Sequence, residues 1–194
     1  MSTIRTVASP RGPARLHEDA GDAGLLVLGH GAGGGPEAPD LLAARDGALD
    51  AGWAVCRLEQ PWRVAGRRIA EAPLHLDAAW TAVVRELAQR PLVLGGRSSG
   101  ARVACRTASE LGAAAVLALA FPLVPPGRAV SRAHELALPT VPVLVVQGER
   151  DAFGVPPGAA VVAGADHGFA VRKRDADPLP VVRELVRAFL QTVT

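Results

Sequence analysis

One serine stands in a pattern that is typical of a nucleophile at the end of a strand. The segment PLVLGGRSSGARVA runs from an apolar stretch into Gly96-Arg97-Ser98-Ser99-Gly100 and then into helical spacing. In a Gly-x-Ser-x-Gly turn, the glycines avoid Cβ clashes and the serine hydroxyl projects at the helix N-terminus. The alternative is an ordinary glycine-rich turn between a strand and a helix. The strand-turn-helix context favours Ser98 as a nucleophile.

A serine hydroxyl is a weak nucleophile, so it needs a base that a third group orients. An apolar run, PVLVV, leads into QGERD and puts Asp151 after its carboxyl end, while VVAGADHGF puts His167 after the next apolar run. The carboxyl ends of parallel strands meet at one edge of a sheet, which is where open α/β sheets build their sites. The chain order serine, acid, histidine also occurs in one large class of hydrolases. We therefore predict a triad of Ser98, Asp151 and His167.

Other acids and histidines near these segments are weaker candidates. Asp166 is next to His167 in the chain, and neighbouring side chains diverge, so Asp151 is the better partner. Glu149 remains a second candidate for the acid. The histidines interpreted as surface or packing residues are His17, His75 and His134.

A glycine-rich loop follows the first apolar run and can supply donors for an oxyanion. In LLVLGHGAGGGPE, the glycines let backbone N–H groups approach a substrate oxygen. One donor should be the N–H of Ser99, the residue after the nucleophile. For the other we favour Ala32, with Gly33 as the alternative, and we interpret His30 as a residue that braces the loop.

The same loop also matches a dinucleotide-binding fingerprint. Gly29-x-Gly31-x-x-Gly34 follows a strand, and Glu59 closes the next strand, where an acid would bind ribose. However, that fingerprint should open a helix at once, so that the helix N-terminus meets the pyrophosphate. Here Gly and Pro residues delay the helix until about Asp40. A dinucleotide protein is therefore a minor alternative.

Short apolar runs alternate with longer segments of helical periodicity, which predicts an α/β fold with a mostly parallel, doubly wound sheet and helices on both faces. We expect strands at 25–28, 53–58, 91–94, 114–121, 141–146 and, more weakly, 159–163. We expect helices at 39–51, 74–89, 99–111 and 178–194. Asp40 should cap the first helix, and Gly52 should end it. Residues 1–194 should form one domain; before about Asp22 the chain could add one or two edge strands that the pattern does not place.

Composition excludes several classes of protein. The 194 residues carry a formal charge of +2, and basic and acidic residues are interleaved, so no nucleic-acid-binding stripe is expected. The N-terminal segment has no apolar stretch of a signal peptide, and no run approaches the ~18 apolar residues of a membrane span. Cys56 and Cys105 lie in predicted core elements without metal-ligand spacing. We expect a cytoplasmic protein with core thiols.

The motifs together resemble the α/β-hydrolase superfamily, and within it the dienelactone-hydrolase-like proteins. More narrowly, the chain resembles small bacterial hydrolases related to testis-expressed protein 30 and to the third subunit of the non-specific-lethal chromatin complex. The matching stretches are GHGAGG, Arg57 to Trp62, GGRSSGARVA, FPLVPPGR, LPTVPVLVVQGERDAFG and GADHGF. The resemblance implies a serine esterase or related hydrolase with the same triad, a small acyl substrate, and no metal or organic cofactor. Some relatives are subunits of complexes, so an inactive interaction protein is the alternative.

The segment between Phe121 and Val141 is short, although many larger hydrolases insert a helical cap there. We therefore expect a minimal, capless α/β-hydrolase with a shallow, open pocket. The predicted pocket walls are Trp62, Leu123, Phe153 and Phe169, with Phe121 and Pro122 beside them. Simple core packing is an equally good interpretation for any one of them. Both a monomer and a homodimer are compatible with the sequence.

Overall fold

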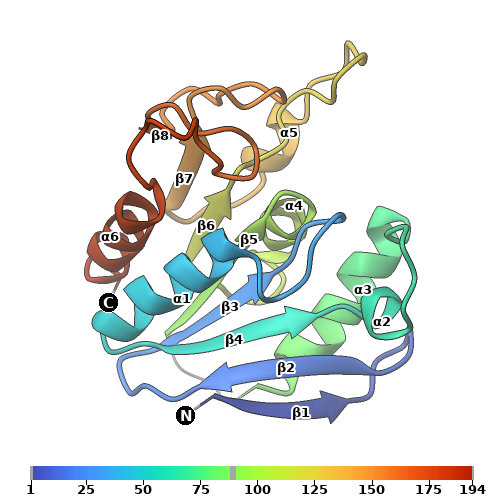
Figure 1. Cartoon of the computed structure of the whole chain (residues 1–194). Helices are drawn as coiled ribbons and strands as arrows, with labels where there is room; N and C mark the ends of the chain where they lie inside the picture. The colour runs from blue at the N-terminus through green and yellow to red at the C-terminus, as the bar shows by residue number, and fades with distance from the viewer. Residues whose placement is uncertain (1, 88–90, 194) are drawn as a thin grey trace.

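Apolar strands assemble into one sheet that carries the rest of the molecule (Figure 1). The computed structural model describes residues 2–87 and 91–193. Within them, eight strands pair in the order β1-β2-β4-β3-β5-β6-β7-β8. The strands are β1 (Thr3–Val7), β2 (Ala14–Asp19), β3 (Leu25–Gly29), β4 (Ala54–Glu59), β5 (Leu92–Arg97), β6 (Ala115–Leu119), β7 (Val143–Gly148) and β8 (Ala160–Val162). The helices are α1 (Pro39–Asp50), α2 (Pro61–Val64), α3 (Pro73–Arg85), α4 (Ser99–Thr107), α5 (Ala133–Leu136) and α6 (Leu179–Leu190).

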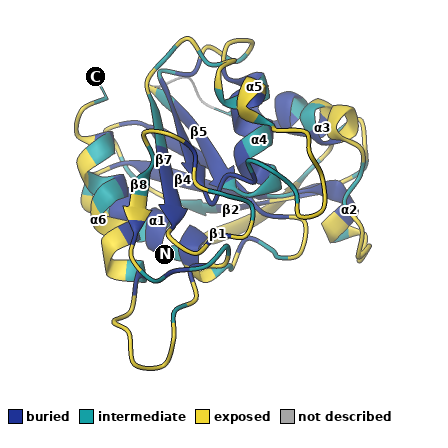
Figure 2. Ribbon diagram, turned by 90° about the horizontal axis from the view of Figure 1, so that it is seen from above, coloured by how far each residue is buried: buried dark blue, intermediate teal, exposed yellow. Residues whose placement is uncertain are grey.

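Helices cover both faces of the sheet and divide the core in two. One buried cluster joins α3 and α4 to the sheet through residues such as Trp80 and Val103. The other joins α1 and α6 to the opposite face through residues such as Leu41 and Val186. Figure 2 shows the buried residues gathered in the sheet and on the inner sides of the helices. Because both faces are covered, the central strands are nearly continuous apolar runs, which is why the sequence pattern revealed them.

The predicted fold class is confirmed. Strands β4, β3, β5, β6, β7 and β8 are parallel to their neighbours in this row. The N-terminal segment adds both possible edge strands: β1 pairs antiparallel with β2, and β2 pairs antiparallel with β4. Four of the five residues of β1 are exposed and all six of β4 are at least half-buried, so the edge strand lacked the continuous apolar pattern of the centre.

Several predicted boundaries differ from those observed. Helix α3 ends at Arg85, and residues 88 and 89 of the predicted helix lie outside the described residues, as does Thr194 of the last one. Helix α4 ends at Thr107, and a turn then reaches Gly112, whose φ of +64° is left-handed. The short helices α2 and α5 were not predicted, because a single turn has too few residues to show a period.

The prediction that Asp40 caps α1 is wrong. Pro39 is the first helical residue, and the N-cap is Ala38, which makes no side-chain capping bond. Proline suits the first helical position because its fixed φ and missing N–H are tolerated there. Asp40 therefore lies inside the first turn, and its carboxylate is free for the contact described below.

The structure bears out two further expectations about the core and the cap. Cys56 and Cys105 are free and buried, and burial raises the pKa of each thiol to about 12. Between β6 and β7 the described chain forms loops and the single turn of α5, without a lid domain. Every helix in residues 2–87 and 91–193 is too short or too polar to cross a membrane.

Candidate active site

The turn from β5 into α4 holds Ser98 in a strained conformation against the neighbouring strand. Ser98 has a φ of +53°, which is uncommon for a residue with a side chain, and its N–H donates to the Leu119 carbonyl at 2.9 Å. A Cβ on Gly96 would lie 2.5 Å from the Gly29 carbonyl oxygen, and one on Gly100 would overlap the same peptide group. The glycine backbone thus packs directly on β3. This close approach fixes the nucleophile at the carboxyl edge of the sheet.

The three predicted triad residues lie within hydrogen-bond distance of one another. His167 Nε2 is 3.0 Å from Ser98 Oγ, and His167 Nδ1 is 2.8 Å from Asp151 Oδ2. A carboxylate can only accept, so the Nδ1–H donates to Asp151 and Nε2 accepts the Ser98 O–H; this tautomer follows from the network. The Asp151 side chain is fully buried, whereas the imidazole of His167 is 22% exposed. The loops after β5, β7 and β8 therefore meet at the edge of the sheet where the carboxyl ends of these parallel strands lie.

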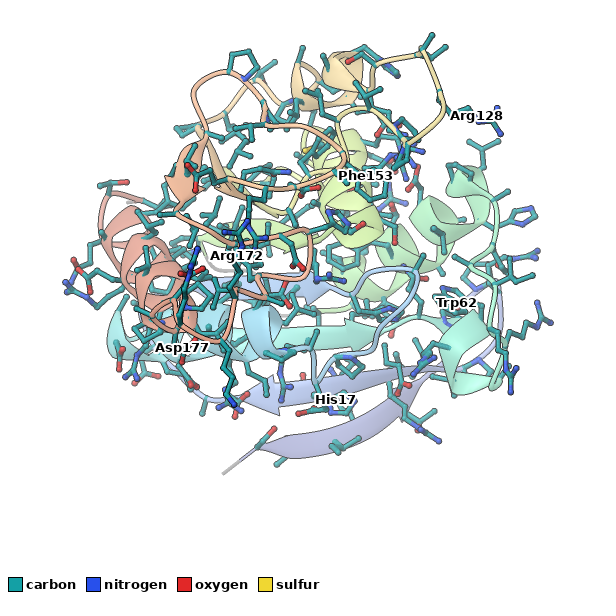
Figure 3. All side chains as sticks on the ribbon, turned by 45° about the horizontal axis from the view of Figure 1, so that its top comes forward. His17, Trp62, Arg128, Phe153, Arg172 and Asp177 are labelled. Atoms are coloured by element: carbon teal, nitrogen blue, oxygen red, sulfur yellow. The ribbon has the colours of Figure 1, made fainter. Side chains whose placement is uncertain are left out.

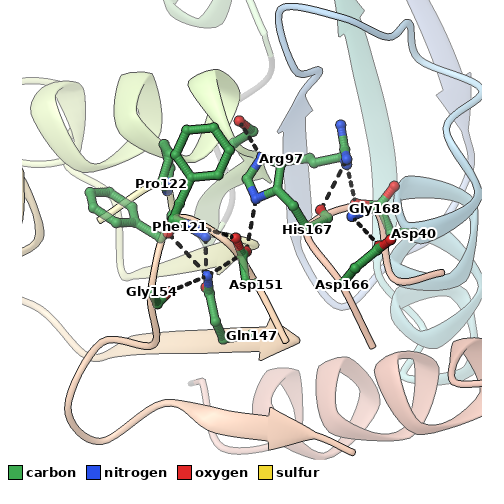
Figure 4. A network of polar contacts seen from close by, with 12 residues as sticks. Asp40, Arg97, Phe121, Pro122, Gln147, Asp151, Gly154, Asp166, His167 and Gly168 are labelled. Carbon is green, nitrogen blue, oxygen red and sulfur yellow. Dashed lines mark hydrogen bonds and ion pairs between the residues drawn. The ribbon is translucent and has the colours of Figure 1, made fainter. Parts of the chain in front are cut away.

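Gln147 supports the acid from below and was missed by the sequence analysis. Its Nε2 donates to Asp151 Oδ2 at 2.7 Å and also lies 3.1 Å from the Phe121 carbonyl and 3.0 Å from that of Gly154. Its Oε1 accepts the Phe121 N–H at 2.8 Å (Figure 4). Gln147 is completely buried. The available signal was a lone amide in the apolar strand VLVVQG, because a buried polar side chain must find partners.

The competing acids have other roles. Asp151 Oδ1 accepts the Phe153 N–H at 2.8 Å, so both oxygens of the triad acid are bonded. Glu149 instead accepts the N–H of Gly164 at 2.7 Å, and Asp166 Oδ1 accepts two N–H groups of its own turn. Within the described chain, neither of these two carboxylates bonds the imidazole of His167.

The glycine loop after β3 packs against the nucleophile turn. A Cβ on Gly31 would lie 3.5 Å from the Ser98 Cβ. The backbone N–H groups of Ser99, Ala32 and Gly33 have no acceptor among the described residues, so they are available to an oxyanion. This arrangement leaves both Ala32 and Gly33 as candidates for the second donor.

His30 braces this loop. Its Nδ1–H donates to the Gly31 carbonyl at 2.9 Å, and its Nε2 accepts the Gln60 N–H at 3.1 Å. Burial lowers the pKa of His30 below its ordinary value, chiefly by desolvation. The ring is therefore neutral and fixed between two strands, as a structural rather than a reacting histidine.

A family comparison agrees with this architecture. A family model described as "Alpha/beta hydrolase domain" matches residues 22–191. The chain belongs to this family. No curated protein matches the sequence.

Solved structures share the hydrolase fold over nearly the whole chain. An alpha-beta serine hydrolase homologue from Coxiella burnetii is 18% identical, with a TM-score of 0.77 and 97% of each chain covered. A serine hydrolase without a lid from Xanthomonas campestris is 20% identical, with a TM-score of 0.75, over 96% of this chain and 92% of that one. A dienelactone hydrolase from Anabaena variabilis is 14% identical, with a TM-score of 0.73, over 100% and 99%. At these identities the likeness concerns the fold.

The predicted pocket walls of this α/β-hydrolase domain divide into two groups. The Phe153 ring packs against the His167 ring at a tilt of 36°, with ring centroids 4.3 Å apart, and Leu123 is half-buried nearby. Trp62 and Phe169, in contrast, are 3% and 2% exposed and belong to the two core clusters. Figure 3 shows Phe153 on the segment after β7 and Trp62 at α2. Phe121 and Pro122 are also buried.

Burial of Trp62 and Phe169 departs from the prediction that they line the pocket. Trp62 packs on His30 with a centroid distance of 5.5 Å, so it supports the glycine loop from behind. Phe169 has a φ of +56° and turns inward from the His167 loop. A large aromatic ring on a loop end is drawn into the core when a cavity is available, and the sequence does not show that cavity.

A cavity of about 560 Å³ lies beside the His167 loop, between it and the segment that leads into α1. Its lining includes several charged side chains and consists of His17, Gly34, Gly35, Pro36, Glu37, Ala38, Pro39, Asp40, Glu59, Arg63, Arg97 and Gly168. Here Glu59 lies 3.6 Å from Arg15 and 3.8 Å from His17, and α1 begins only at Pro39. The helix N-terminus and free acid of a dinucleotide site are therefore not found at this loop.

Proposed function

We propose that this protein is a serine hydrolase that cleaves an ester or a similar acyl bond through an acyl-enzyme on Ser98. The observation that carries the proposal is the continuous chain of hydrogen bonds from Ser98 Oγ through His167 to Asp151. Such a chain activates a hydroxyl because the base can remove its proton while the acid holds the base in one tautomer. Membership of the α/β-hydrolase family supports the same reading.

In the first half-reaction, His167 Nε2 takes the Ser98 proton as Oγ forms a bond to the acyl carbon. The N–H groups of Ser99 and of Ala32 or Gly33 stabilise the negative oxygen. Asp151 stabilises the imidazolium, which then gives its proton to the leaving oxygen as the bond from that oxygen to the acyl carbon breaks. An alcohol departs and the acyl group stays on Ser98.

In the second half-reaction, His167 removes a proton from water, and the hydroxyl attacks the acyl carbon. The acid product leaves and Ser98 regains its proton. The described chain has no lid domain over this site. This supports an acyl substrate that is small or that binds while partly exposed to solvent. Phe153 and Leu123 are the side chains we propose to contact it.

A fluorophosphonate probe tests the assignment directly. We expect wild-type protein to be labelled at Ser98 and to hydrolyse short acyl esters or lactones. The Ser98→Ala variant should lose both properties while its melting temperature stays near the wild-type value. Ser99→Ala provides the matched control, because the backbone N–H that we assign to the oxyanion is kept. Undiminished labelling of Ser98→Ala would contradict the proposal.

An inactive interaction protein remains the second candidate, and it rests on the narrower sequence resemblance. We propose that the motifs from GHGAGG to GADHGF relate this chain to the small hydrolases near testis-expressed protein 30. Because some proteins of that group are complex subunits, an intact triad without labelling or turnover would favour this second function.

A further inference from the structure

The arginine inside the nucleophile turn contacts three segments of the site, and Figure 4 shows two of these contacts, with His167 and with Asp40. Arg97 Nη2 donates to the His167 carbonyl at 3.0 Å, and its Nε lies 2.9 Å from Asp40 Oδ2 in an ion pair. Its Nη1 is so near the glycine loop that a Cβ on Gly31 would lie 2.9 Å from it. One guanidinium therefore joins the base loop, the start of α1 and the oxyanion loop, next to Ser98 in the chain.

Asp40 has an unusual environment for a carboxylate. It is 1% exposed, and among the described residues its ion-pair partner is Arg97. Burial raises its pKa, while the charge of Arg97 acts in the opposite direction. Removing two charges from water costs several kcal/mol per ion, so a buried pair of this kind is weak support for stability. Its contacts point to a geometric role.

The His167 turn packs on β7 at its base, where the carbonyls of Ala165 and Asp166 lie against Gly148, and it is anchored by the buried ring of Phe169. Asp166 organises the turn internally, through the N–H groups of Gly168 and Ala170. The Arg150 N–H bonds the Ala165 carbonyl at 2.8 Å at the base of the turn. The bond from Arg97 holds the peptide of His167 itself, directly below the imidazole. Displacement of a reacting group by about 1 Å can cost about 100-fold in rate.

The charge of Asp40 completes this arrangement. A lone guanidinium beside His167 would oppose the positive charge that the imidazole gains when it takes the Ser98 proton. The carboxylate of Asp40 neutralises Arg97 without contacting the base, so Arg97 can hold the His167 peptide without that opposing field.

We propose that Arg97 and Asp40 are a positioning pair: Arg97, clamped by Asp40, holds the His167 turn and the Gly31 loop in place around Ser98. The inference rests on the proposed hydrolase function. Neither residue touches the reacting atoms, so their effect should fall on kcat more than on KM. Arg97 is the residue immediately before the serine in the Gly96-Arg97-Ser98-Ser99-Gly100 turn.

Four variants and one control test the pair. We expect Arg97→Met and Asp40→Asn each to lower kcat about 10- to 100-fold with KM within about twofold. Arg97→Lys keeps the charge but not the planar fork, so it should recover part of the loss. The double variant Asp40→Asn/Arg97→Met should be no worse than the single ones, because the pair acts as a unit.

The matched control is Arg106→Met, at the other end of α4. Arg106 pairs with Asp77 at 2.6 Å, and its side chain is 16% exposed, as is that of Arg97. This variant should lose stability but keep the wild-type kcat. If Arg97→Met fails to fold because Asp40 is left unpaired, the double variant removes both charges and carries the same expectation.

Amide hydrogen exchange in residues 166–170 decides the inference without relying on activity. Exchange should rise at least about tenfold in Arg97→Met and in the double variant, and stay unchanged in Arg106→Met. Unchanged exchange in this turn would overturn the inference, even if kcat fell. Absence of labelling in the wild type would instead contradict the hydrolase function, and the exchange result would still decide the positioning role.

Discussion

Two parts of the site are held by different kinds of force. The nucleophile turn at residues 96–100 is held by backbone packing, since Gly96 and Gly100 lie directly on the peptide of Gly29. The acid and the base are held by polar side chains: Gln147 on Asp151, and Arg97 on the His167 peptide. The closely packed backbone of the turn has no room for an added atom. A hydrogen bond from a side chain, in contrast, can be replaced by another with a modest loss of stability. Changes in the turn should therefore damage the fold, and changes in the acid and base should damage the rate.

The largest effect is expected when the triad acid becomes an amide. Asp151→Asn keeps the shape but favours the wrong tautomer of His167, so kcat should fall about 10⁴-fold while the fold is retained. Steady-state kinetics and a thermal melt measure the two effects separately. Glu149→Gln is the matched control, two residues earlier, and should keep kcat within about twofold. Full activity of Asp151→Asn would move the acid role to another carboxylate.

A methyl group in the nucleophile turn should have the next largest effect, and it should fall on stability. Gly100→Ala would force its Cβ into the Gly29 peptide, so we expect a loss of about 3 kcal/mol in the free energy of unfolding. Denaturant titration measures this loss. At Gly34 a Cβ would meet nothing within 4 Å, so Gly34→Ala should change the free energy by less than about 0.5 kcal/mol. Equal stabilities for the two variants would contradict the idea that close backbone packing holds the nucleophile turn.

Removal of the amide beneath the acid should be milder. Gln147→Leu takes one donor from Asp151 and leaves the buried Phe121 N–H without its acceptor. We expect kcat to fall about tenfold and stability to fall by about 1–3 kcal/mol. Kinetic measurements under conditions where both proteins are equally folded separate the loss of kcat from the loss of stability. The exposed Gln191, changed to Leu, serves as the control; a Gln147→Leu protein with wild-type kcat would limit Gln147 to a packing role.

The oxyanion loop is held both by backbone packing and by a polar side chain, His30. Because His30 can be protonated, its contribution to stability should depend weakly on pH. The pKa of His30 is lowered in the fold, so below about pH 6.5 the unfolded chain binds a proton that the folded protein does not. Stability should therefore fall as the pH drops from 7.5 to 5.5. Denaturant titration at the two pH values measures this decrease in the free energy of unfolding. The decrease should be smaller by about 1 kcal/mol in His30→Gln than in the wild type. His75→Gln, at an exposed position, should behave as the wild type does.

Features that depend on neighbouring residues were open to prediction from the sequence. The central strands follow from continuous apolar runs, because a sheet covered on both faces needs them. The nucleophile turn follows from Gly96 and Gly100, since the close contact they permit is a local property of the backbone. The chain order and strand ends were enough to name Asp151 and His167, which the structure brings to Ser98.

Long-range contacts decided the rest. The edge strand β1 is stabilised by pairing with β2, which pairs in turn with β4; four of the five residues of β1 are exposed, so the strand shows no apolar run. Trp62 and Phe169 were misplaced because burial depends on which cavity a distant segment leaves open. Asp40 was assigned to a helix cap, whereas its partner is Arg97 on another element. The sequence by itself thus determined which residues could react; tertiary structure decided which side chains hold them, because those partners meet only when the sheet has formed.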